Sequence, residues 1–359
     1  MRALPKILPR ILITGGAGFV GSAIGVRLKQ AWPQAHITAL DNLKRRGTEL
    51  IVQRLRENGI EFLHGDVRVR EDLPAGEYDL LIECSAEPSV LAGYGSSPSY
   101  LIDTNLHGLL HCLEWCRERK AGLLFLSTSR VYPVKALAEL TLEESAERLD
   151  IAAQQAIPGV GAAGISEDFP LRGHRSLYGA TKLAAELMIE EYRAAYGMKA
   201  VINRCGVLAG PWQMGKIDQG VFTFWLLRHY FKQPLSYIGF GGQGKQVRDL
   251  LHVDDLADLV LEQSGDLASW DGEVLNVSGG RDISLSLAQT SALCRQITGN
   301  KLDIASVPEN RVMDIPVYYG DCARLFARTA WRPRRDAETI LKDTFAWLKK
   351  HEAALKTVL

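Results

Sequence analysis

The sequence carries no excess of charge of either sign. Among its 359 residues, 42 are Lys or Arg and 42 are Asp or Glu, so the formal net charge is +0. A chain that binds nucleic acid or an anionic membrane surface by electrostatic attraction usually carries a clear positive excess. We therefore expect neither nucleic acid nor a membrane as a partner.

Paired cysteines and long apolar runs are also missing. The six cysteines show none of the close paired spacings of zinc or redox sites, and Cys112 and Cys116 lie four apart in an apolar helical pattern. No apolar run is long enough for a membrane span, and no signal-peptide pattern opens the chain. These absences predict reduced core thiols, no metal site and a soluble, cytoplasmic protein.

What the sequence does contain is an alternation of apolar, β-branched runs with helical patterns. The runs typical of strands are 10–14, 36–40, 61–63, 80–83, 122–127 and 200–203. The helical patterns are 22–30, 48–58, 105–119 and 178–196. Strand and helix in regular alternation predict an α/β fold built on a Rossmann doubly wound parallel sheet.

Two stretches interrupt this rhythm. Residues 133–177 have no clear periodicity, and residues 205–249 are rich in Gly, aromatic residues and Gln. Segments of this length inside a compact fold are often lids or binding loops. We expect a smaller C-terminal substrate-binding lobe beside the Rossmann domain. The expected division is a Rossmann domain over 1–203, a segment near 250–280 that returns to it, and a substrate-binding lobe from 204–249 and 281–359.

A glycine-rich turn follows the first strand. Gly15, Gly18 and Gly21 lie between that strand and a helix, an arrangement that lets the backbone and the helix N-terminus bind a pyrophosphate. Asp41 ends the next strand about 20 residues on, where a carboxylate accepts hydrogen bonds from ribose hydroxyls and repels a 2′-phosphate. The pattern therefore predicts NAD rather than NADP. Asp66, after the third strand, either reaches the adenine amino group or belongs to an ordinary strand-end turn.

A second group of residues predicts the reactive part of the site. Tyr178 and Lys182 are four apart on a helix and share a face. The lysine ammonium and a positive nicotinamide ring both favour the phenolate, so Tyr178 can act as a base. Thr128, in the stretch STSRVY, follows the strand 122–127, and hydroxyls at the carboxyl end of a parallel strand face the ligand crevice. It can therefore hydrogen-bond the same substrate oxygen.

With these residues in place, the chain resembles the extended short-chain dehydrogenase/reductase family of NAD-dependent sugar-nucleotide epimerases and dehydratases. The resemblance covers nearly the whole chain. Its motifs are TGGAGFVGS at 14–22, GDV at 65–67, SLYGATKLAAE at 176–186, GKQVRDLLHVDDL at 244–256 and NVSGG at 276–280. Within the family, the chain is most similar to the CDP-paratose 2-epimerases, also called CDP-tyvelose epimerases.

The resemblance, together with the patterns above, indicates the site residues. It implies that Thr128, Tyr178 and Lys182 are catalytic and that Arg248 and Arg311 contact the nucleotide diphosphate. The candidate cofactor-binding residues are Gly15, Gly18, Phe19, Val20, Gly21, Asp41, Asn42, Asp66, Val67, Ala86, Asn105, Tyr178 and Lys182. The candidate substrate-binding residues are Glu87, Ser129, Arg130, Arg204, Gln213, Gln219, Gln246, Arg248, Arg311 and Asp314. For Glu87, contact with a sugar hydroxyl and a capping turn are both open.

The residues after Thr128 separate two reaction types. Dehydratases of the family carry Asp-Glu there, because elimination needs an acid and a base. Here the places hold Ser129 and Arg130, and neither is suited to proton transfer. We therefore expect an NAD-dependent epimerase that inverts C2 of a CDP-linked hexose through a 2-keto intermediate. The nearest alternative is a UDP-sugar 4-epimerase, and the alternative of another class is a non-catalytic NAD-sensing regulator, which would not need the catalytic trio. A homo-oligomer, dimer or tetramer, is also expected.

Overall fold

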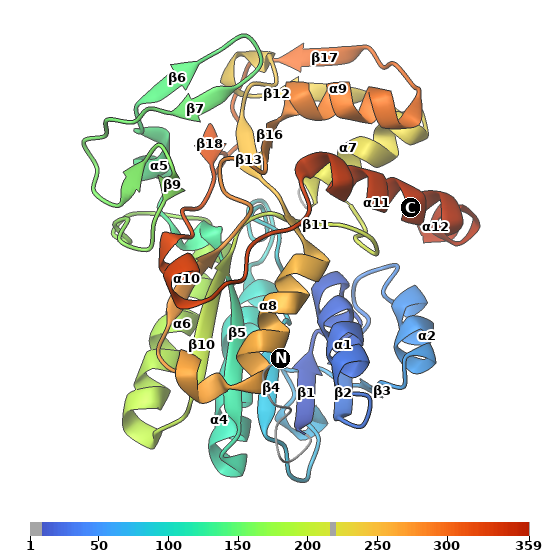
Figure 1. Cartoon of the computed structure of the whole chain (residues 1–359), viewed down its shortest axis with the longest axis vertical. Coiled ribbons are helices and arrows are strands. Elements are labelled where there is room, and N and C mark those ends of the chain that lie inside the picture. Colours follow the sequence, from blue (N-terminus) through green and yellow to red (C-terminus); the bar gives the residue numbers. More distant parts are fainter. Residues whose placement is uncertain (1–8, 216–219, 359) are drawn as a thin grey trace.

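A seven-stranded parallel sheet forms the centre of the protein (Figure 1). The computed structural model describes residues 9–215 and 220–358. The sheet order is β15-β10-β5-β4-β1-β2-β3, and every neighbouring pair is parallel. The strands are β1 (Arg10–Thr14), β2 (His36–Asp41), β3 (Glu61–His64), β4 (Leu80–Glu83), β5 (Gly122–Thr128), β10 (Ala200–Cys205) and β15 (Val274–Val277). The expected Rossmann sheet is therefore confirmed.

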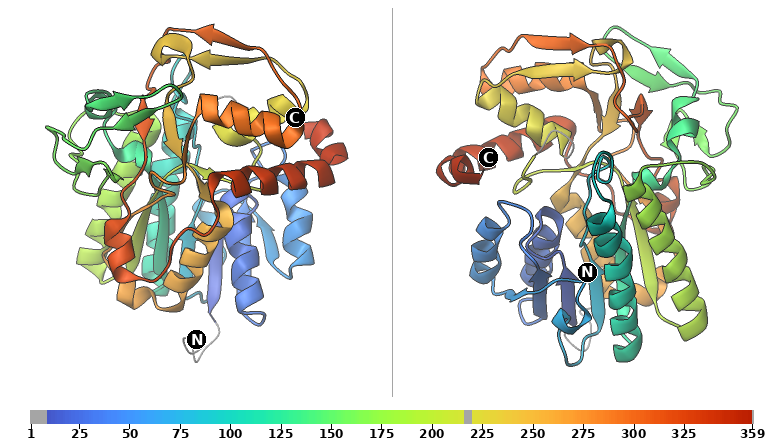
Figure 2. Two further views of the ribbon diagram at one scale, coloured as in Figure 1. Left: turned by 45° about the horizontal axis from the view of Figure 1, so that its top comes forward. Right: turned by 180° about the vertical axis from the view of Figure 1, so that it is seen from behind.

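Helices cover both faces of this sheet (Figure 2). On one face lie α1 (Phe19–Ala31), α2 (Glu49–Glu57) and α8 (Val253–Gly265), and on the other lie α4 (Gly108–Arg119) and α6 (Leu177–Tyr196). Successive strand residues point to opposite faces of the sheet, so each apolar strand contributes side chains to two hydrophobic cores. Ile11 and Ile13 of β1 belong to the core beneath α1, whereas Leu12 belongs to the core beneath α4.

Two helices begin at other residues than their patterns indicated, α1 earlier at Phe19 and α4 later at Gly108. The helix expected at 22–30 starts at Phe19, directly after the glycine turn, so its first turn faces the edge of the sheet. The helix expected at 105–119 is preceded by α3 (Ser99–Ile102) and a π-helical stretch (Asp103–His107). Apolar spacing alone does not mark these starts, because the first turns carry few core residues.

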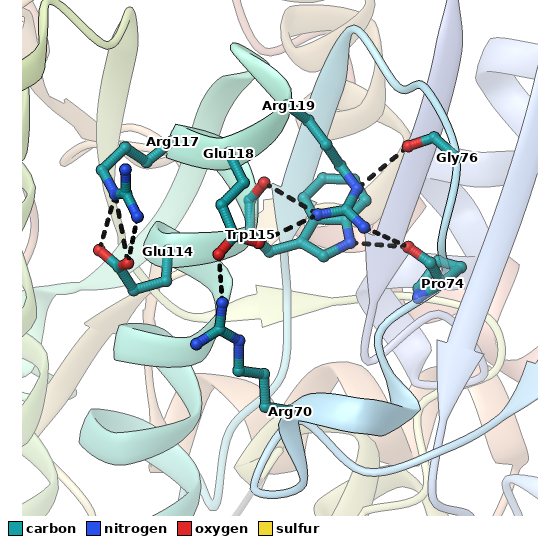
Figure 3. A network of polar contacts seen from close by, with 8 residues as sticks. All are labelled: Arg70, Pro74, Gly76, Glu114, Trp115, Arg117, Glu118 and Arg119. Atoms are coloured by element: carbon teal, nitrogen blue, oxygen red, sulfur yellow. Dashed lines mark hydrogen bonds and ion pairs between the residues drawn. The ribbon is translucent and has the colours of Figure 1, made fainter.

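The carboxyl end of α4 is tied to the loop that precedes β4. Arg119 donates hydrogen bonds to the carbonyl oxygens of Pro74 at 3.2 Å and Gly76 at 3.1 Å, and the Trp115 indole donates to Pro74 at 2.9 Å. Figure 3 shows this network, together with the ion pair between Arg70 and Glu118. The contacts hold the loop against the helix on the edge of the sheet away from the strands' carboxyl ends.

Most elements after β10 lie over the carboxyl edge of the sheet (Figure 1). The helices are α7 (Val221–Tyr230), α9 (Leu287–Thr298), α11 (Ala337–Lys350) and α12 (Glu352–Val358), whereas α10 (Ala323–Arg328) packs beside β15 of the central sheet. The short strands are β11 (Leu208–Ala209), β12 (Leu235–Ile238), β13 (Val247–Asp249), β14 (Leu251–His252), β16 (Ser284–Ser286), β17 (Ile304–Val307) and β18 (Val317–Tyr318). The helices α7, α9 and α11 pack around a core that includes Trp225, Leu226 and Trp347.

The stretch 133–177 is ordered into short elements despite its weak periodicity. They are α5 (Val134–Ala138), the hairpin β6 (Leu142–Glu144) and β7 (Leu149–Ile151), and the pair β8 (Val160–Gly161) and β9 (Gly164–Ile165). Its apolar side chains, such as Leu137 and Phe169, form a separate core with residues from β13 and β18. This core lies at the side of the molecule, next to the elements over the sheet edge (Figure 1).

The cysteines are all free, and all but Cys84 are buried. Cys112 and Cys116 lie in the core beneath α4. Within residues 9–215 and 220–358, no helix has the length and hydrophobicity needed to cross a bilayer. The same residues contain no group of His, Cys, Asp and Glu side chains placed to hold a metal ion.

Candidate active site

A cavity of about 740 Å³ opens along the carboxyl edge of the sheet. One wall comes from the ends of β1, β2, β4, β5 and β10, and the facing wall comes from segments near 212–214, 220–228, 234–238 and 311–314. Because parallel strands all end at this edge, residues that are far apart in the sequence meet here. The candidate cofactor-binding, substrate-binding and catalytic residues are therefore expected to line this cavity.

Most of the candidate residues line this cavity. They are Gly15, Gly18, Phe19, Val20, Gly21, Asp41, Asn42, Val67, Ala86, Glu87, Thr128, Ser129, Arg130, Tyr178, Lys182, Gln213, Gln246, Arg248, Arg311 and Asp314. The candidates therefore converge on one site, although their individual roles stay predictions.

Three candidates lie elsewhere, and Gln219 lies outside the described residues. Arg204 points into the protein, where it pairs with Glu186 at 2.7 Å. Asn105 is buried and exchanges hydrogen bonds with the backbone of Glu87, which places it behind the cavity wall. Asp66 pairs with Arg68 at 2.7 Å and accepts from Asn42 at 2.9 Å. Burial opposes ionisation of Asp66, but these donors lower its pKa to about 2.

The glycine turn leaves backbone exposed on the cavity floor. Gly15 has a left-handed φ of 63°, and a Cβ there would lie 2.7 Å from the carbonyl carbon of Cys84. A Cβ on Gly21 would lie 2.4 Å from the carbonyl oxygen of Gly15, so glycine permits this close packing of helix on strand. No side chain among the described residues caps the first turn of α1 at Gly18. Its N–H groups and the helix dipole suit a pyrophosphate.

Asp41 is held at the cavity edge by two backbone groups. Its Oδ2 accepts from Ala17 at 3.1 Å, and its Oδ1 accepts from Leu43 at 2.8 Å. Burial raises the pKa of Asp41, and these two hydrogen bonds act in the opposite direction. Each oxygen keeps a further lone pair for a ligand hydroxyl. The glycine turn and this carboxylate therefore fit the pyrophosphate and ribose of a dinucleotide.

The catalytic candidates meet where β5 ends and α6 begins. Ser176 caps α6 by accepting from the Gly179 N–H at 3.1 Å, and Tyr178 and Lys182 follow on the first turns. Thr128, the last residue of β5, lies close enough to the phenol of Tyr178 to lower its pKa. This arrangement can bind a substrate hydroxyl between a phenol and a threonine hydroxyl.

The charges around Tyr178 differ from the sequence-based expectation. Burial raises the pKa of Tyr178 to about 12, although the Thr128 hydrogen bond and the nearby Arg130 lower it. The Lys182 ammonium lies 3.5 Å from a carboxylate oxygen of Glu83 rather than unpaired beside the phenol. In the ligand-free protein the phenol therefore stays protonated at neutral pH, and the expectation that Lys182 and a nicotinamide ring together favour the phenolate stays a prediction.

A basic group lines the cavity beyond the trio. Arg248 pairs with Asp314 at 2.7 Å, and Arg130 donates to the carbonyl oxygen of Met313 at 3.4 Å. Burial and the positive charge of Arg248 lower the pKa of Arg130 to about 10, so its guanidinium stays charged at neutral pH. Arg311 lines the same part of the cavity. Three guanidinium groups with one carboxylate suit a diphosphate.

The facing wall contains residues that sequence reasoning missed. Arg228 of α7 lines the cavity and lies over the ring of Phe224 at 4.9 Å, and Trp225 lies beside them. The aromatic content of 205–249 was the available signal for this wall. Gln246 donates to the carbonyl oxygen of Ile238 at 3.0 Å, while its buried Oε1 has no partner among the described residues. That oxygen is free to accept a hydrogen bond from a ligand.

Comparison with known proteins gives consistent matches. The model of the family described as "NAD dependent epimerase/dehydratase family" matches residues 11–278. CDP-paratose 2-epimerase of Salmonella typhi is 26% identical over 94% of this chain and 98% of that protein. A dTDP-glucose 4,6-dehydratase of Mycobacterium tuberculosis is 26% identical over 96% of this chain and 94% of its own. The structure of Thermus thermophilus UDP-glucose 4-epimerase in complex with NAD is 25% identical, covers 95% and 99% of the two chains, and has a TM-score of 0.72.

Proposed function

Because the chain belongs to the NAD dependent epimerase/dehydratase family, we propose that it is an epimerase that inverts C2 of a CDP-linked hexose. The sugar would be of the CDP-paratose, CDP-tyvelose or CDP-glucose type, and the reaction would pass through a 2-keto intermediate. Similarity to the CDP-paratose 2-epimerase of Salmonella typhi over nearly all of both chains supports this choice of substrate.

The observation that carries the proposal is the composition of the cavity around Tyr178. Thr128, Tyr178 and Lys182 line it together, and the two residues that follow Thr128 are Ser129 and Arg130. An elimination needs a general acid and a base at these two positions, whereas a charged guanidinium transfers no proton at neutral pH. The residues therefore support oxidation and re-reduction of one carbon without loss of a hydroxyl.

The chain's own residues would divide the work as follows. NAD, when bound, supplies the transient oxidation by taking up a hydride and returning it. The glycine turn would hold the pyrophosphate of NAD, and Asp41 would accept hydrogen bonds from one ribose. Lys182 would contact the other ribose of the cofactor. Tyr178 would take the proton of the substrate hydroxyl and later give it back, and Thr128 would donate a hydrogen bond to the same oxygen. Arg248 and Arg311 would hold the diphosphate while the sugar presents its other face.

Isotope retention tests this proposal. CDP-glucose that carries deuterium at C2 is incubated with the purified protein in ordinary water, and the product is analysed by NMR and mass spectrometry. We expect inversion at C2 with the deuterium kept on that carbon, because no carbonyl neighbours C2 to make its hydrogen acidic. Loss of the label to solvent would refute the hydride route. Inversion at C4 of a UDP-hexose, with C2 untouched, would favour the UDP-sugar 4-epimerase alternative.

We also propose that the protein is a cytoplasmic homo-oligomer, dimer or tetramer. The six free thiols are typical of a reducing compartment. On α6, Leu187 is 57% exposed and Tyr196 is 58% exposed, and large apolar side chains at this exposure are candidates for a subunit contact. Light scattering coupled to gel filtration measures the mass directly, and a monomer at micromolar concentration would contradict the oligomer.

A further inference from the structure

Glu83 is a buried acid that sequence analysis did not identify as a site residue. It is the last residue of β4, between Thr14 of β1 and Phe125 of β5. Its side chain is 4% exposed, and the next two residues of the chain, Cys84 and Ser85, line the cavity. A central strand buried on both faces is normally apolar, so a carboxylate at this position needs a partner.

The partner is the Lys182 ammonium. Nζ lies 3.5 Å from Oε2 of Glu83 and 4.1 Å from the centroid of the Phe125 ring, and the lysine side chain is 3% exposed. Burial raises the pKa of Glu83, while the Lys182 ammonium and the polar groups of Ser85 lower it. Either charge alone would be costly to bury, whereas together they leave the cavity floor neutral at this point.

We propose that Glu83 is a positioning residue, which holds the Lys182 ammonium in place and, by cancelling its charge, sets the pH at which Tyr178 can accept a proton. This inference rests on the proposed role of Tyr178 as the base. The geometry supports it because the Glu83 carboxylate lies 3.5 Å from the Lys182 ammonium, and Lys182 follows Tyr178 by one turn on α6, so the two side chains share a face of that helix. Removing the negative charge would leave an uncompensated cation on this face.

Other groups that face Tyr178 also change the pKa of its phenol. They are Thr128 and Arg130 at the end of β5 and Cys205 at the end of β10. After burial, which is the main cause of the raised pKa of Tyr178, Thr128 and Arg130 lower it, while Cys205 and Glu83 raise it further. Among these neighbours, Glu83 is the acid whose charge can be removed by an isosteric change.

The test compares two buried acids that each pair with a cation. Glu83→Gln removes the charge beside Lys182. Glu186→Gln removes the charge that pairs with Arg204 at 2.7 Å, and this second pair does not line the cavity. Phenolate absorbance is titrated in the ligand-free proteins, and the Tyr178 component is isolated by subtracting the same titration in the Tyr178→Phe background. We expect Glu83→Gln to move that component to lower pH by roughly one unit. Glu186→Gln should lower thermal stability without moving it.

The pH profile of turnover gives the second readout. The limb of the profile that rises as Tyr178 loses its proton should shift to lower pH in Glu83→Gln and stay in place in Glu186→Gln. Equal shifts in both variants, or no shift in either, would overturn the role of Glu83. If Glu83→Gln does not fold, Glu83→Asp withdraws the carboxylate by one methylene and should shift the titration in the same direction by less; no shift there would also overturn it. A titration shift without turnover of any nucleotide hexose would count against the proposed function and leave the role of Glu83 standing.

Discussion

At the scale of single residues, the pKa of the buried Tyr178 phenol depends on the groups that surround it. Burial raises its pKa to about 12, far above the pH at which a base is useful in the cell. Under the proposed function, a bound and positively charged nicotinamide ring would lower the cost of the phenolate, so the base would form when the ligands are bound. The threonine at the end of β5 and the arginine that follows it act in the same direction. Tyr178 in its proposed role would therefore depend on these neighbours and on the bound cofactor.

The first prediction concerns this phenol. Tyr178→Phe should fold and bind NAD normally but lose about 10²–10⁴-fold in turnover, because only the proton-transferring oxygen is removed. Thr128→Val should lose less, since it deletes a hydrogen bond and keeps the base. Turnover and NAD affinity are measured on the same preparations. Near wild-type turnover in Tyr178→Phe would contradict the proposed chemistry.

At the scale of elements, α6 and the end of β5 approach each other more closely than a side chain would allow. A Cβ built on Gly179 would lie 2.1 Å from the carbonyl oxygen of Arg130. The contact is with backbone, which cannot move aside without shifting α6 or β5. Glycine at this position therefore brings Tyr178 within reach of Thr128, which makes Gly179 a packing residue of the active site.

Gly179→Ala is the second prediction. The added methyl group should push α6 away from β5, lower the thermal stability and reduce turnover at least tenfold, as strain of this kind typically costs 1–3 kcal/mol. Gly161→Ala is the matched control, because a Cβ on Gly161 would meet nothing within 4 Å. Melting temperature and turnover are compared for both variants. Equal behaviour of the two alanines would show that the close approach is unimportant.

The stretch 133–177 also acts at this scale. Its core includes Val247 of β13 and Ile315, and these two residues are the chain neighbours of Arg248 and Asp314. Val131 in the same core is likewise the chain neighbour of Arg130. On β13 successive side chains point to opposite sides, so Val247 anchored in this core directs Arg248 toward the cavity. Val131 and Ile315 fix the backbone beside Arg130 and Asp314, which lie outside strands. We infer that this stretch supports the diphosphate end of the site from behind.

The third prediction follows from that support. Phe169→Ala removes a fully buried ring from this core and should cost about 3 kcal/mol of stability. It should also raise the KM for the nucleotide sugar more than the Kd for NAD. The reason is that this core supports the backbone beside Arg130 and Arg248, and it does not support the glycine turn. Leu113→Ala in the core beneath α4 is the control, with loss of stability but no preferential effect on the sugar. Parallel changes in both variants would remove the inferred link.

At the scale of the whole molecule, the neutral net charge hides an uneven distribution. Among residues 9–215 and 220–358, the acidic side chains that line the cavity are Asp41, Glu87 and Asp314. The basic side chains that line it in the same part of the chain are Lys44, Arg45, Arg130, Lys182, Arg228, Arg248 and Arg311. A surplus of cations in a concave, partly desolvated site suits two ligands that each carry a diphosphate. NAD and a nucleotide sugar are such a pair.

The fourth prediction concerns the cofactor. The protein should purify with NAD partly bound, because NAD is needed again in every cycle and its release would leave a keto-sugar behind. Chromatography and mass spectrometry of the denatured protein identify the cofactor. Asp41→Ala should reduce the NAD content and lessen the discrimination against NADP, since the carboxylate that repels a 2′-phosphate is gone. Recovery of NADP alone from the parent protein would refute the role of Asp41.

The sequence by itself determined the features that depend on local order. Strand and helix periodicity predicted the Rossmann sheet, which is confirmed, because each element's apolar pattern reflects the face that it buries. The glycine turn with Asp41 predicted NAD, and the motifs predicted an epimerase of the extended family. The family match over residues 11–278 confirms the cofactor and the enzyme class, and it does not support the non-catalytic regulator.

Tertiary structure alone decided which distant residues meet. Arg204 was expected at the substrate, but folding pairs it with Glu186, and Lys182 is paired with Glu83 instead of acting on the phenol alone. Arg228 enters the cavity although its segment gave only a compositional signal. Partners of this kind are separated by tens of residues or come from irregular segments, where no periodic pattern records them. Their charge and packing are set by the burial that the assembled sheet and its covering elements impose.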